Sequence, residues 1–354
     1  MSGDRIRAAV IGAGWWGAAS HLPTLASRPE VILDGVCRLG TEELERVRAH
    51  FGVAFASEDH RDVLARRPDV VVVASPHHLH FRQAADALEA GAHVLVEKPM
   101  TLDPAEAWAL VRLAEARGRH LLVCNPYQYL PVLDEIGTLL QDGRAVGRIE
   151  SVACSFVSVT RSVFTGAEGL SKWKSTFFRP DRATWQDPRQ GGGFAYGQMS
   201  HAIPLALWLT GLVPRTVRAA TVDAEGVDLC NAATVLFEGG AIGTFHGAAA
   251  MPEGHRVLMR LTVSGTDGVA ILDIDRDRAE IRRGDGGSRV FAVPEGTWIP
   301  ESRTPTDALV DLALGRGENR SPGRIGAAAV GTIAAMLDAA RGGEGRVHRP
   351  EAGP

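Results

Sequence analysis

The stretch Gly12-Ala13-Gly14-Trp15-Trp16-Gly17 follows the apolar run Ile6–Ile11 directly and leads into residues that favour a helix. A strand, a glycine-rich turn and a helix start therefore stand in the order that dinucleotide-binding units use. In such a unit the first glycine allows the tight turn, the second lets backbone N–H groups approach a pyrophosphate, and the third lets helix and strand pack closely. An ordinary glycine-rich surface turn is the alternative, which the preceding strand disfavours. The sequence predicts nucleotide contacts at Gly12, Gly14, Trp15, Trp16 and Gly17.

Length and composition indicate a globular protein of two domains. The 354 residues exceed the usual size of a single core, and an apolar share of 45% is enough to fill two cores. The net charge is −4, from 38 basic and 42 acidic residues, and no basic block marks a surface for a phosphate backbone. We therefore expect no nucleic-acid partner.

Cysteine usage and hydropathy bear on the compartment. The four cysteines stand far apart without a C-x-x-C spacing, which is typical of reduced thiols that serve as packing residues. No apolar stretch is expected to reach membrane-spanning length, and the first strand begins too close to Met1 to leave room for a signal peptide. We expect a cytoplasmic protein without a membrane partner.

Apolar strands alternate with amphipathic helices through the first third of the chain. Strands rich in Val, Leu, Ile and Ala are covered on both faces, which favours a parallel sheet joined by right-handed crossovers. The pattern predicts a doubly wound Rossmann domain, of class α/β, over residues 1–126. Its expected strands are Ile6–Ile11, Val31–Cys37, Val70–Ala74, His93–Glu97 and His120–Cys124.

The pattern changes after Pro126. A helix near 132–141 and a long strand near 149–158 are followed by an irregular stretch, a buried helix and several strands with short turns. Hairpin signals such as Glu238-Gly239-Gly240 favour a large open sheet, mixed or antiparallel. We predict an α+β domain over residues 127–340 that binds substrate and mediates oligomers, and a mobile tail over 341–354, where apolar content is low.

Arg38 stands at the tip of the expected second strand, where the adenosine ribose lies in dinucleotide-binding units. An acid at this position accepts hydrogen bonds from the 2′-OH of NAD. An arginine can pair with a 2′-phosphate instead, so Arg38 favours NADP as the cofactor. The alternative is that Arg38 stacks on the adenine or points into solvent while NAD is bound.

Three further motifs complete a family pattern. Ser75-Pro76-His77-His78-Leu79-His80 and Glu97-Lys98-Pro99 stand at the tips of the expected strands Val70–Ala74 and His93–Glu97, and Gly191-Gly192-Gly193 precedes His201 on an apolar helix. Together with the glycine-rich turn they resemble the glucose-fructose oxidoreductase / inositol dehydrogenase (Gfo/Idh/MocA) family of NAD(P)-dependent sugar and polyol oxidoreductases. The resemblance implies a Rossmann domain joined to a sheet-forming domain that lines the substrate pocket and often forms dimers or tetramers. It also implies a Lys-Pro peptide that is often cis.

Lys98 is the first catalytic candidate. Ligands of open α/β sheets bind beyond the carboxyl ends of the strands, where Lys98 can direct its ammonium at a substrate oxygen and stabilise alkoxide character. The alternative is a solvated lysine at a strand end. The predicted cofactor contacts at these strand tips are Ser75, His77, His80, Glu97 and Lys98.

His201 is the second catalytic candidate, because an imidazole can take the hydroxyl proton and return it. A histidine buried in an apolar helix for packing alone is the alternative. Relatives usually carry an aspartate four residues earlier, where this chain has Gly197. Gln198 is the nearest polar neighbour and cannot supply charge. We name Gln198 and Tyr127 as substrate-contact candidates, and Tyr127 also as a candidate auxiliary proton donor.

The irregular segment from Thr160 to Gln190 interleaves aromatic and basic residues and is either a carbohydrate-binding loop or a packing segment. We name Trp173 and Trp185 as substrate-contact candidates. The histidines at 77, 78 and 80 have no carboxylate or cysteine at ligand spacing, so we expect no metal.

These observations favour an NAD(P)-dependent oxidoreductase that moves a hydride between a secondary alcohol of a sugar, glycoside or cyclitol and the nicotinamide. One alternative is an NAD-dependent glycosidase or lyase that oxidises the sugar transiently. Another is a non-catalytic NADP-binding protein, which the glycine at position 197 keeps open.

Overall fold

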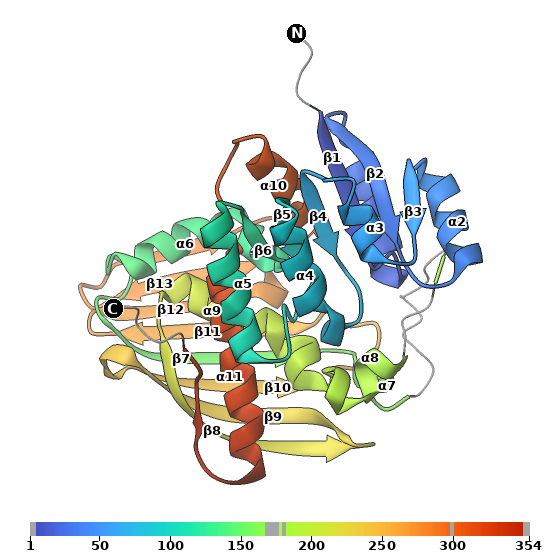
Figure 1. Ribbon diagram of the computed structural model, residues 1–354. Coiled ribbons are helices and arrows are strands. Elements are labelled where there is room, and N and C mark those ends of the chain that lie inside the picture. Colours follow the sequence, from blue (N-terminus) through green and yellow to red (C-terminus); the bar gives the residue numbers. More distant parts are fainter. Residues whose placement is uncertain (1–4, 167–176, 179–181, 298–300, 350–354) are drawn as a thin grey trace. The chain divides into compact units, whose positions relative to one another are not determined.

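The computed structural model describes residues 5–166, 177–178, 182–297 and 301–349 (Figure 1). The chain forms two compact units. The first unit contains Met1–Pro126, Ser171–Asp181 and Glu301–Ala327, and the second contains Tyr127–Leu170, Arg182–Pro300 and Ala328–Pro354. The first boundary between the two units follows Pro126, where the sequence pattern changes. Residues 301–327, which the sequence assigned to the second domain, belong to the first unit.

The first unit is built on a six-stranded sheet in the order β3-β2-β1-β4-β5-β6, and every pair of neighbours is parallel. This confirms the predicted Rossmann class, because the order reverses between β1 and β4, and ligands of such sheets bind beyond the carboxyl ends of the strands at this point. The short β3 was not predicted, since three half-buried residues give no readable pattern. The strands are β1 Ile6–Ile11, β2 Val31–Cys37, β3 Phe55–Ser57, β4 Val70–Val73, β5 His93–Val96 and β6 Leu121–Val123.

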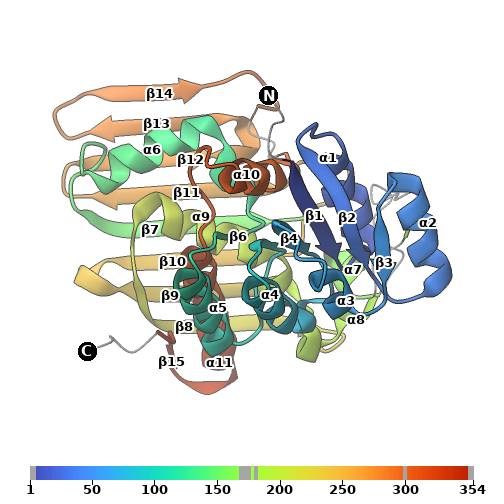
Figure 2. The same ribbon diagram turned by 45° about the horizontal axis from the view of Figure 1, so that its top comes forward.

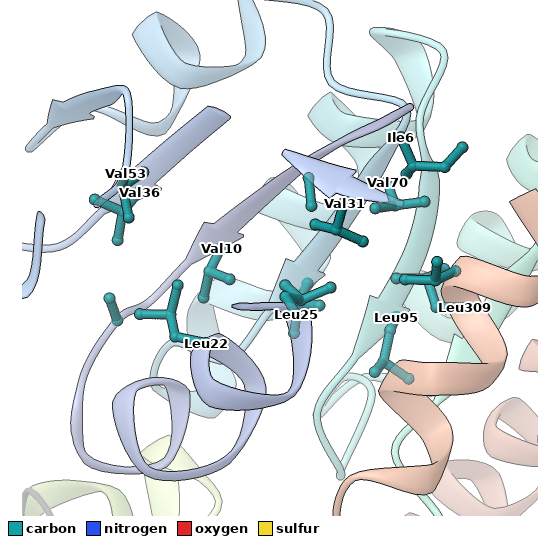
Figure 3. Close-up of a cluster of buried hydrophobic side chains, with 14 of the residues drawn as sticks. Ile6, Val10, Leu22, Leu25, Val31, Val36, Val53, Val70, Leu95 and Leu309 are labelled. Carbon is teal, nitrogen blue, oxygen red and sulfur yellow. The ribbon is translucent and has the colours of Figure 1, made fainter. Parts of the chain in front are cut away.

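Helices cover this sheet, and one of them returns from near the end of the chain. Leu309 of α10 packs beside Leu95 of β5 in the hydrophobic core of the unit (Figure 3). The sequence could not place α10 here, because nothing local marks which sheet an amphipathic helix will cover. The helices are η1 Gly17–His21, α1 Leu22–Ala26, α2 Thr41–Phe51, α3 His60–Leu64, η2 His77–Leu79, α4 His80–Glu89, α5 Pro104–Arg117 and α10 Thr304–Ala313.

The second unit contains a nine-stranded sheet in the order β14-β13-β12-β11-β7-β10-β9-β8-β15 (Figure 2). Strands β7 and β10 pair in parallel and the other neighbours are antiparallel, which confirms the predicted mixed sheet. The strands are β7 Ile149–Val157, β8 Pro214–Ala224, β9 Val227–Phe237, β10 Ile242–Ala248, β11 Leu258–Gly265, β12 Gly268–Asp273, β13 Arg278–Arg283, β14 Ser288–Ala292 and β15 Gly345–Arg346.

The buried helix α9 packs on this sheet and against α6, where the Gln141 side-chain amide donates to the carbonyl of Trp208. Burial of α9 on nearly every side explains why its sequence is apolar almost throughout. The helices of the second unit are η3 Pro126–Tyr129, α6 Pro131–Gln141, α7 Arg161–Phe164, α8 Arg182–Gln186, η4 Pro188–Gln190, η5 Ala195–Met199, α9 Ser200–Thr210, η6 Glu238–Gly240 and η7 Ile274–Arg276; α11 Gly323–Gly342 crosses the last boundary between the units.

Residues 341–349, expected to form a mobile tail, are part of the fold. Strand β15 pairs with β8, and the buried Val347 donates its backbone N–H to the carbonyl of Arg215. A Cβ on Gly345 would lie 2.0 Å from the carbonyl oxygen of Ala335, so a glycine is what lets this segment approach α11 closely. The segment is held by backbone hydrogen bonds to β8 and by the buried side chain of Val347, although its overall apolar content is low.

Helix α11 also corrects the expectation that no segment reaches membrane-spanning length. Its most apolar window has a mean hydropathy of 1.2, so by length and composition alone this 20-residue helix could cross a membrane. In the folded protein, 61% of that window is buried. A core helix meets the same criteria, because burial in a fold selects apolar residues as a bilayer does.

Candidate active site

The glycine turn between β1 and η1 lies against the tip of β4. Gly12 has a φ of +89°, and a Cβ there would lie 2.2 Å from the backbone nitrogen of Ser75. A Cβ on Gly17 would lie 2.5 Å from the carbonyl oxygen of Gly12. A Cβ on Gly14 would meet nothing within 4 Å, so the backbone here faces open space. The turn therefore fits the approach of a pyrophosphate at Gly14.

Two tryptophans begin the helix that follows this turn. The half-buried rings of Trp15 and Trp16 lie 5.1 Å apart at an interplanar angle of 49°. They keep apolar surface at the mouth of the turn, and their contact with a nucleotide stays a prediction.

Arg38, directly after β2, is held by an aromatic ring from a distant part of the first unit. Its guanidinium carbon lies 3.8 Å from the ring centroid of Phe178, and its Nε donates to the carbonyl of Leu39. Its Nη1 is buried and has no hydrogen-bond partner among the residues that the structure describes. Burial lowers the pKa of Arg38, while Glu43 opposes and Arg46 adds to that shift. One face of the guanidinium is thus covered, and an edge donor is left for an anion such as a 2′-phosphate.

His80 joins the tips of β4 and β5. Its ring nitrogens lie 2.8 Å from the carbonyl oxygens of Pro99 and Ser75, and the ring is fully buried. The hydroxyl of Ser75 donates to Gln83, and His77 is buried on η2. Burial lowers the pKa of His80, and the two carbonyls oppose that shift. His80 therefore ties the tips of β4 and β5 together, and its contact with a nucleotide stays a prediction.

Glu97 and Lys98 follow β5, and the Lys98-Pro99 peptide is cis, as the resemblance implied. One carboxylate oxygen of Glu97 lies 3.0 Å from Nε2 of His21, and the other accepts the backbone N–H of Lys98. Burial alone would raise the pKa of Glu97, but the hydrogen bond and charge of His21 and the charge of Lys98 lower it to about 2. Burial lowers the pKa of Lys98, and the Glu97 carboxylate opposes this.

Two further residues complete this network, and the sequence analysis missed both of their roles. Nδ1 of His21 lies 2.8 Å from the hydroxyl of Thr306 on α10. Burial and the Glu97 carboxylate raise the pKa of the Cys124 thiol well above its usual value, so the thiol stays protonated. His21, Glu97 and Cys124 each place a ligand atom within 4.8 Å of the others. Since both nitrogens of His21 already have partners, we interpret the cluster as a hydrogen-bonded network.

His201 lies in the first turn of α9 in the second unit, among aromatic rings. The ring centroid of Tyr127 is 6.1 Å away and that of Phe156 is 6.3 Å away, both nearly perpendicular to the imidazole. Burial raises the pKa of Tyr127 to about 12, against the opposing charge of Arg256, so its phenol stays protonated and can donate. The structure thus brings together two of the predicted site residues, while Gln198 is buried on the preceding η5.

The structure explains the glycine at position 197. A Cβ there would lie 2.8 Å from Cζ of Phe164 and 3.5 Å from the ring of Trp185. The fully buried phenyl ring of Phe164 therefore occupies the space that an aspartate side chain would need. Trp185 packs on Phe164 with ring centroids 6.2 Å apart, whereas Trp173 lies outside the described residues.

A buried carboxyl that the sequence analysis missed supports this segment from the sheet. Asp228 on β9 accepts the backbone N–H of Ala195 at 2.9 Å and the side-chain amide of Asn231 at 3.2 Å. A Cβ on Gly193 would lie 2.3 Å from its other oxygen. Burial raises the pKa of Asp228 to about 6, against these two hydrogen bonds. The Gly191-Gly192-Gly193 run could have indicated this contact, because consecutive glycines often mark a place where another group approaches the backbone closely.

Comparison with known families agrees with these features. Residues 6–124 match the model described as an oxidoreductase family with an NAD-binding Rossmann fold (GFO/IDH/MocA), and residues 142–271 match the GFO/IDH/MocA C-terminal domain. The chain belongs to the GFO/IDH/MocA family. The resemblance stated from the motifs is thereby confirmed, and the nucleotide unit is of the NAD-binding Rossmann type.

Several relatives of this GFO/IDH/MocA protein have described activities. The D-glucoside 3-dehydrogenase of Escherichia coli is 33% identical over 34% of this chain and 35% of its own length. The NADP-dependent scyllo-inositol 2-dehydrogenase IolW of Bacillus subtilis is 27% identical over 64% of this chain and 58% of its own length. The match therefore spans less than two thirds of these relatives.

Among solved structures, GenD2 from gentamicin A biosynthesis, in complex with NAD, is 25% identical. The superposition covers 98% of this chain and 97% of that one, with a TM-score of 0.75. The GFO/IDH/MocA fold is thus present along nearly the whole chain, in both units.

Proposed function

We propose that this protein is an NAD(P)-dependent dehydrogenase that transfers hydride between a secondary alcohol of a sugar, glycoside or cyclitol and the nicotinamide. The carrying observation is Lys98, held with a buried carboxylate beside it at the carboxyl edge of the Rossmann sheet. The relatives that are named as glucoside and inositol dehydrogenases support the substrate class.

The nicotinamide supplies the hydride acceptor when it is bound. Lys98 donates a hydrogen bond to the substrate oxygen and stabilises the charge that grows there, because its ammonium is partly desolvated. We assign the proton transfer to His201. Tyr127 acts as a donor to substrate, since its phenol does not ionise near neutral pH. Aromatic surface at Trp185 suits the C–H face of a sugar ring.

We propose NADP as the preferred cofactor. Within the described part of the chain the buried Nη1 of Arg38 has no hydrogen-bond partner, and Arg46 adds positive charge with its guanidinium 5.4 Å from the same Phe178 ring. The phenyl ring covers one face of Arg38, which favours edge-on pairing with a phosphate over stacking on the adenine. The NADP specificity named for the Bacillus subtilis relative is in line with this choice.

We also propose that the protein forms a homo-dimer or homo-tetramer through the nine-stranded sheet. Leu236 and Ile242 pair directly across β9 and β10 and are 46% and 48% exposed. Large apolar side chains paired on a solvent-facing sheet surface are typical of an interface between subunits. Light scattering on the purified protein measures the number of subunits, and a monomer at micromolar concentration would contradict the proposal.

The central test is a purification followed by a substrate screen. The bound nucleotide is released by denaturation and identified by mass, and sugars and cyclitols are screened for reduced-nicotinamide absorbance with added NAD or NADP. Net formation of NADPH on a sugar or cyclitol supports the dehydrogenase. Glycoside cleavage with a retained cofactor and no net reduction would indicate the transient-oxidation mechanism instead. Binding without any turnover across the screen would indicate a non-catalytic protein.

A further inference from the structure

His21 connects three elements of the first unit at one buried point. It ends η1, its Nε2 reaches Glu97 after β5, and its Nδ1 reaches Thr306 on α10. The imidazole and the Thr306 side chain are fully buried, so water does not compete for these hydrogen bonds. The family resemblance and the proposed function assign no role to His21.

The partners of His21 fix which of its nitrogens carries a proton. An ionised Glu97 only accepts hydrogen bonds, so Nε2 of His21 must carry a proton and donate it. Nδ1 faces the Thr306 hydroxyl, which can donate to a bare nitrogen or accept from a protonated one. His21 therefore donates to Glu97 in either charge state, and the hydrogen bond to Thr306 keeps the ring in the orientation that this requires.

Glu97 is bound at both oxygens, since the second one accepts the backbone N–H of Lys98. The other ionisable groups that face Glu97 are the side chain of Lys98, the Cys124 thiol and the buried His80. A buried carboxyl without strong donors takes up a proton, because burial penalises the charged form. Removing the imidazole would therefore favour neutral Glu97, and the ammonium of Lys98 would lose its counter-charge.

We propose that His21 is a positioning residue that keeps the Glu97 carboxylate ionised and fixed in place, and thereby keeps the Lys98 side chain charged. This inference rests on the proposed function only in making Lys98 the group whose charge matters for turnover. The coupling itself belongs to the folded first unit, and it can be measured without a substrate.

The composition of the chain makes a direct measurement practical. The protein contains three lysines, Lys98, Lys172 and Lys174, so lysine labelled with ¹³C at the ε-carbon gives few signals in an NMR titration. A Lys98→Arg variant identifies the signal of interest by its loss. The titration midpoint of that signal reports the charge of Lys98 in the full-length protein.

His21→Leu removes the donor and keeps an apolar side chain of similar size. We expect the Lys98 midpoint to fall by about one pH unit or more, on the scale of an opposite charge lost in a buried site. His21→Gln retains an amide that can donate to Glu97, and it should restore most of the midpoint. The matched control is His93→Leu, at the opposite end of β5, which should leave the midpoint unchanged. A folded His21→Leu protein with the wild-type midpoint would overturn the inference.

Glu97→Gln provides a second route if His21→Leu does not fold. It removes the charge while keeping the shape of the side chain, so the Lys98 midpoint should fall here too, and an unchanged midpoint would overturn the inference. With a substrate in hand, the pH profile of kcat in His21→Gln should lie closer to wild type than that of His21→Leu. If Lys98 proves irrelevant to turnover, the proposed function fails while the NMR titration still decides the role of His21.

Discussion

The end of β5 in the first unit and the η5–α9 segment in the second unit prepare their reactive groups in different ways. Around Lys98, a carboxylate is bound by a histidine and a backbone N–H, and the histidine is bound in turn by a threonine hydroxyl. Around His201 the described ring contacts are those with Tyr127 and Phe156. The first region controls charge through a polar network, and the second controls orientation through packing.

This difference has a consequence for how each region tolerates change. When one member of a buried hydrogen-bond network is removed, its partner is left without a hydrogen bond. Substitutions around Lys98 should therefore change the charge states of the ionisable groups that remain. In a packed aromatic cluster, a change in side-chain volume should lower stability, because a close-packed interior has no room for an added atom. Variants that change charge in one region and volume in the other therefore test the contrast.

The largest effect is expected at Lys98. Lys98→Ala should lower kcat/KM by about a thousandfold or more, the scale of a group that stabilises developing charge and assists proton transfer. Nucleotide affinity, measured by fluorescence titration, should change by no more than about threefold. Lys98→Met, which keeps the apolar stem, controls for lost packing and should be equally inactive. Turnover close to wild type in either variant would remove Lys98 from the reaction.

In the second region, Gly197→Asp introduces the carboxylate that the family resemblance implied for this position. Its Cβ would lie within 2.9 Å of two atoms of the Phe164 ring, so we expect the variant to lose about 1–3 kcal/mol of stability. Gly197→Ala places the same Cβ without the charge and should show most of the same loss in a thermal melt. The double variant Gly197→Asp with Phe164→Ala opens space for the carboxylate. A fully stable and more active Gly197→Asp protein would show that packing does not govern this region.

The two regions also differ in how much of them could be predicted from sequence. The end of β5 was predictable, because an all-apolar strand followed by Glu97 and Lys98 places those side chains at the carboxyl edge of a parallel sheet. The contact of His21 with Thr306 was not, since 285 residues separate them and no local pattern links the two. In the second unit Gly197 was recognised as a departure, but only the structure shows which ring takes the space. The local sequence therefore predicts where a strand ends, whereas the side chains that contact its end from distant parts of the chain are known only from the structure.

Arg38, directly after β2, provides a further test within the first unit. Arg38→Ala should weaken NADP binding by about tenfold or more, the scale of a charge-assisted hydrogen bond, and should change NAD binding by less than about threefold. Arg48→Ala is the matched control, because Arg48 lies on the neighbouring α2 and pairs with the exposed Glu45. Calorimetric titration with both nucleotides measures the four constants. Equal weakening of NAD and NADP in Arg38→Ala would end the 2′-phosphate assignment.

Asp228, the buried carboxyl beneath η5, is expected to affect stability and not turnover. Its pKa is raised to about 6 by burial, so between about pH 4 and pH 6 the folded protein binds more protons than the unfolded chain. Stability should therefore fall as the pH rises through this window and stay lower above it.

Asp228→Asn keeps an oxygen that can accept the Ala195 N–H but cannot ionise, so the fall should disappear in this variant. At pH 8 the variant should be about 1–3 kcal/mol more stable than wild type, which is the scale of two pKa units. Thermal melts at pH 5 and pH 8 measure the difference, and Asp223→Asn, an exposed neighbour, should change stability by only a few tenths of a kcal/mol. If Asp228→Asn lowers stability at pH 8, the second unit requires an ionised carboxylate after all, and the contrast between a polar and a packed region weakens.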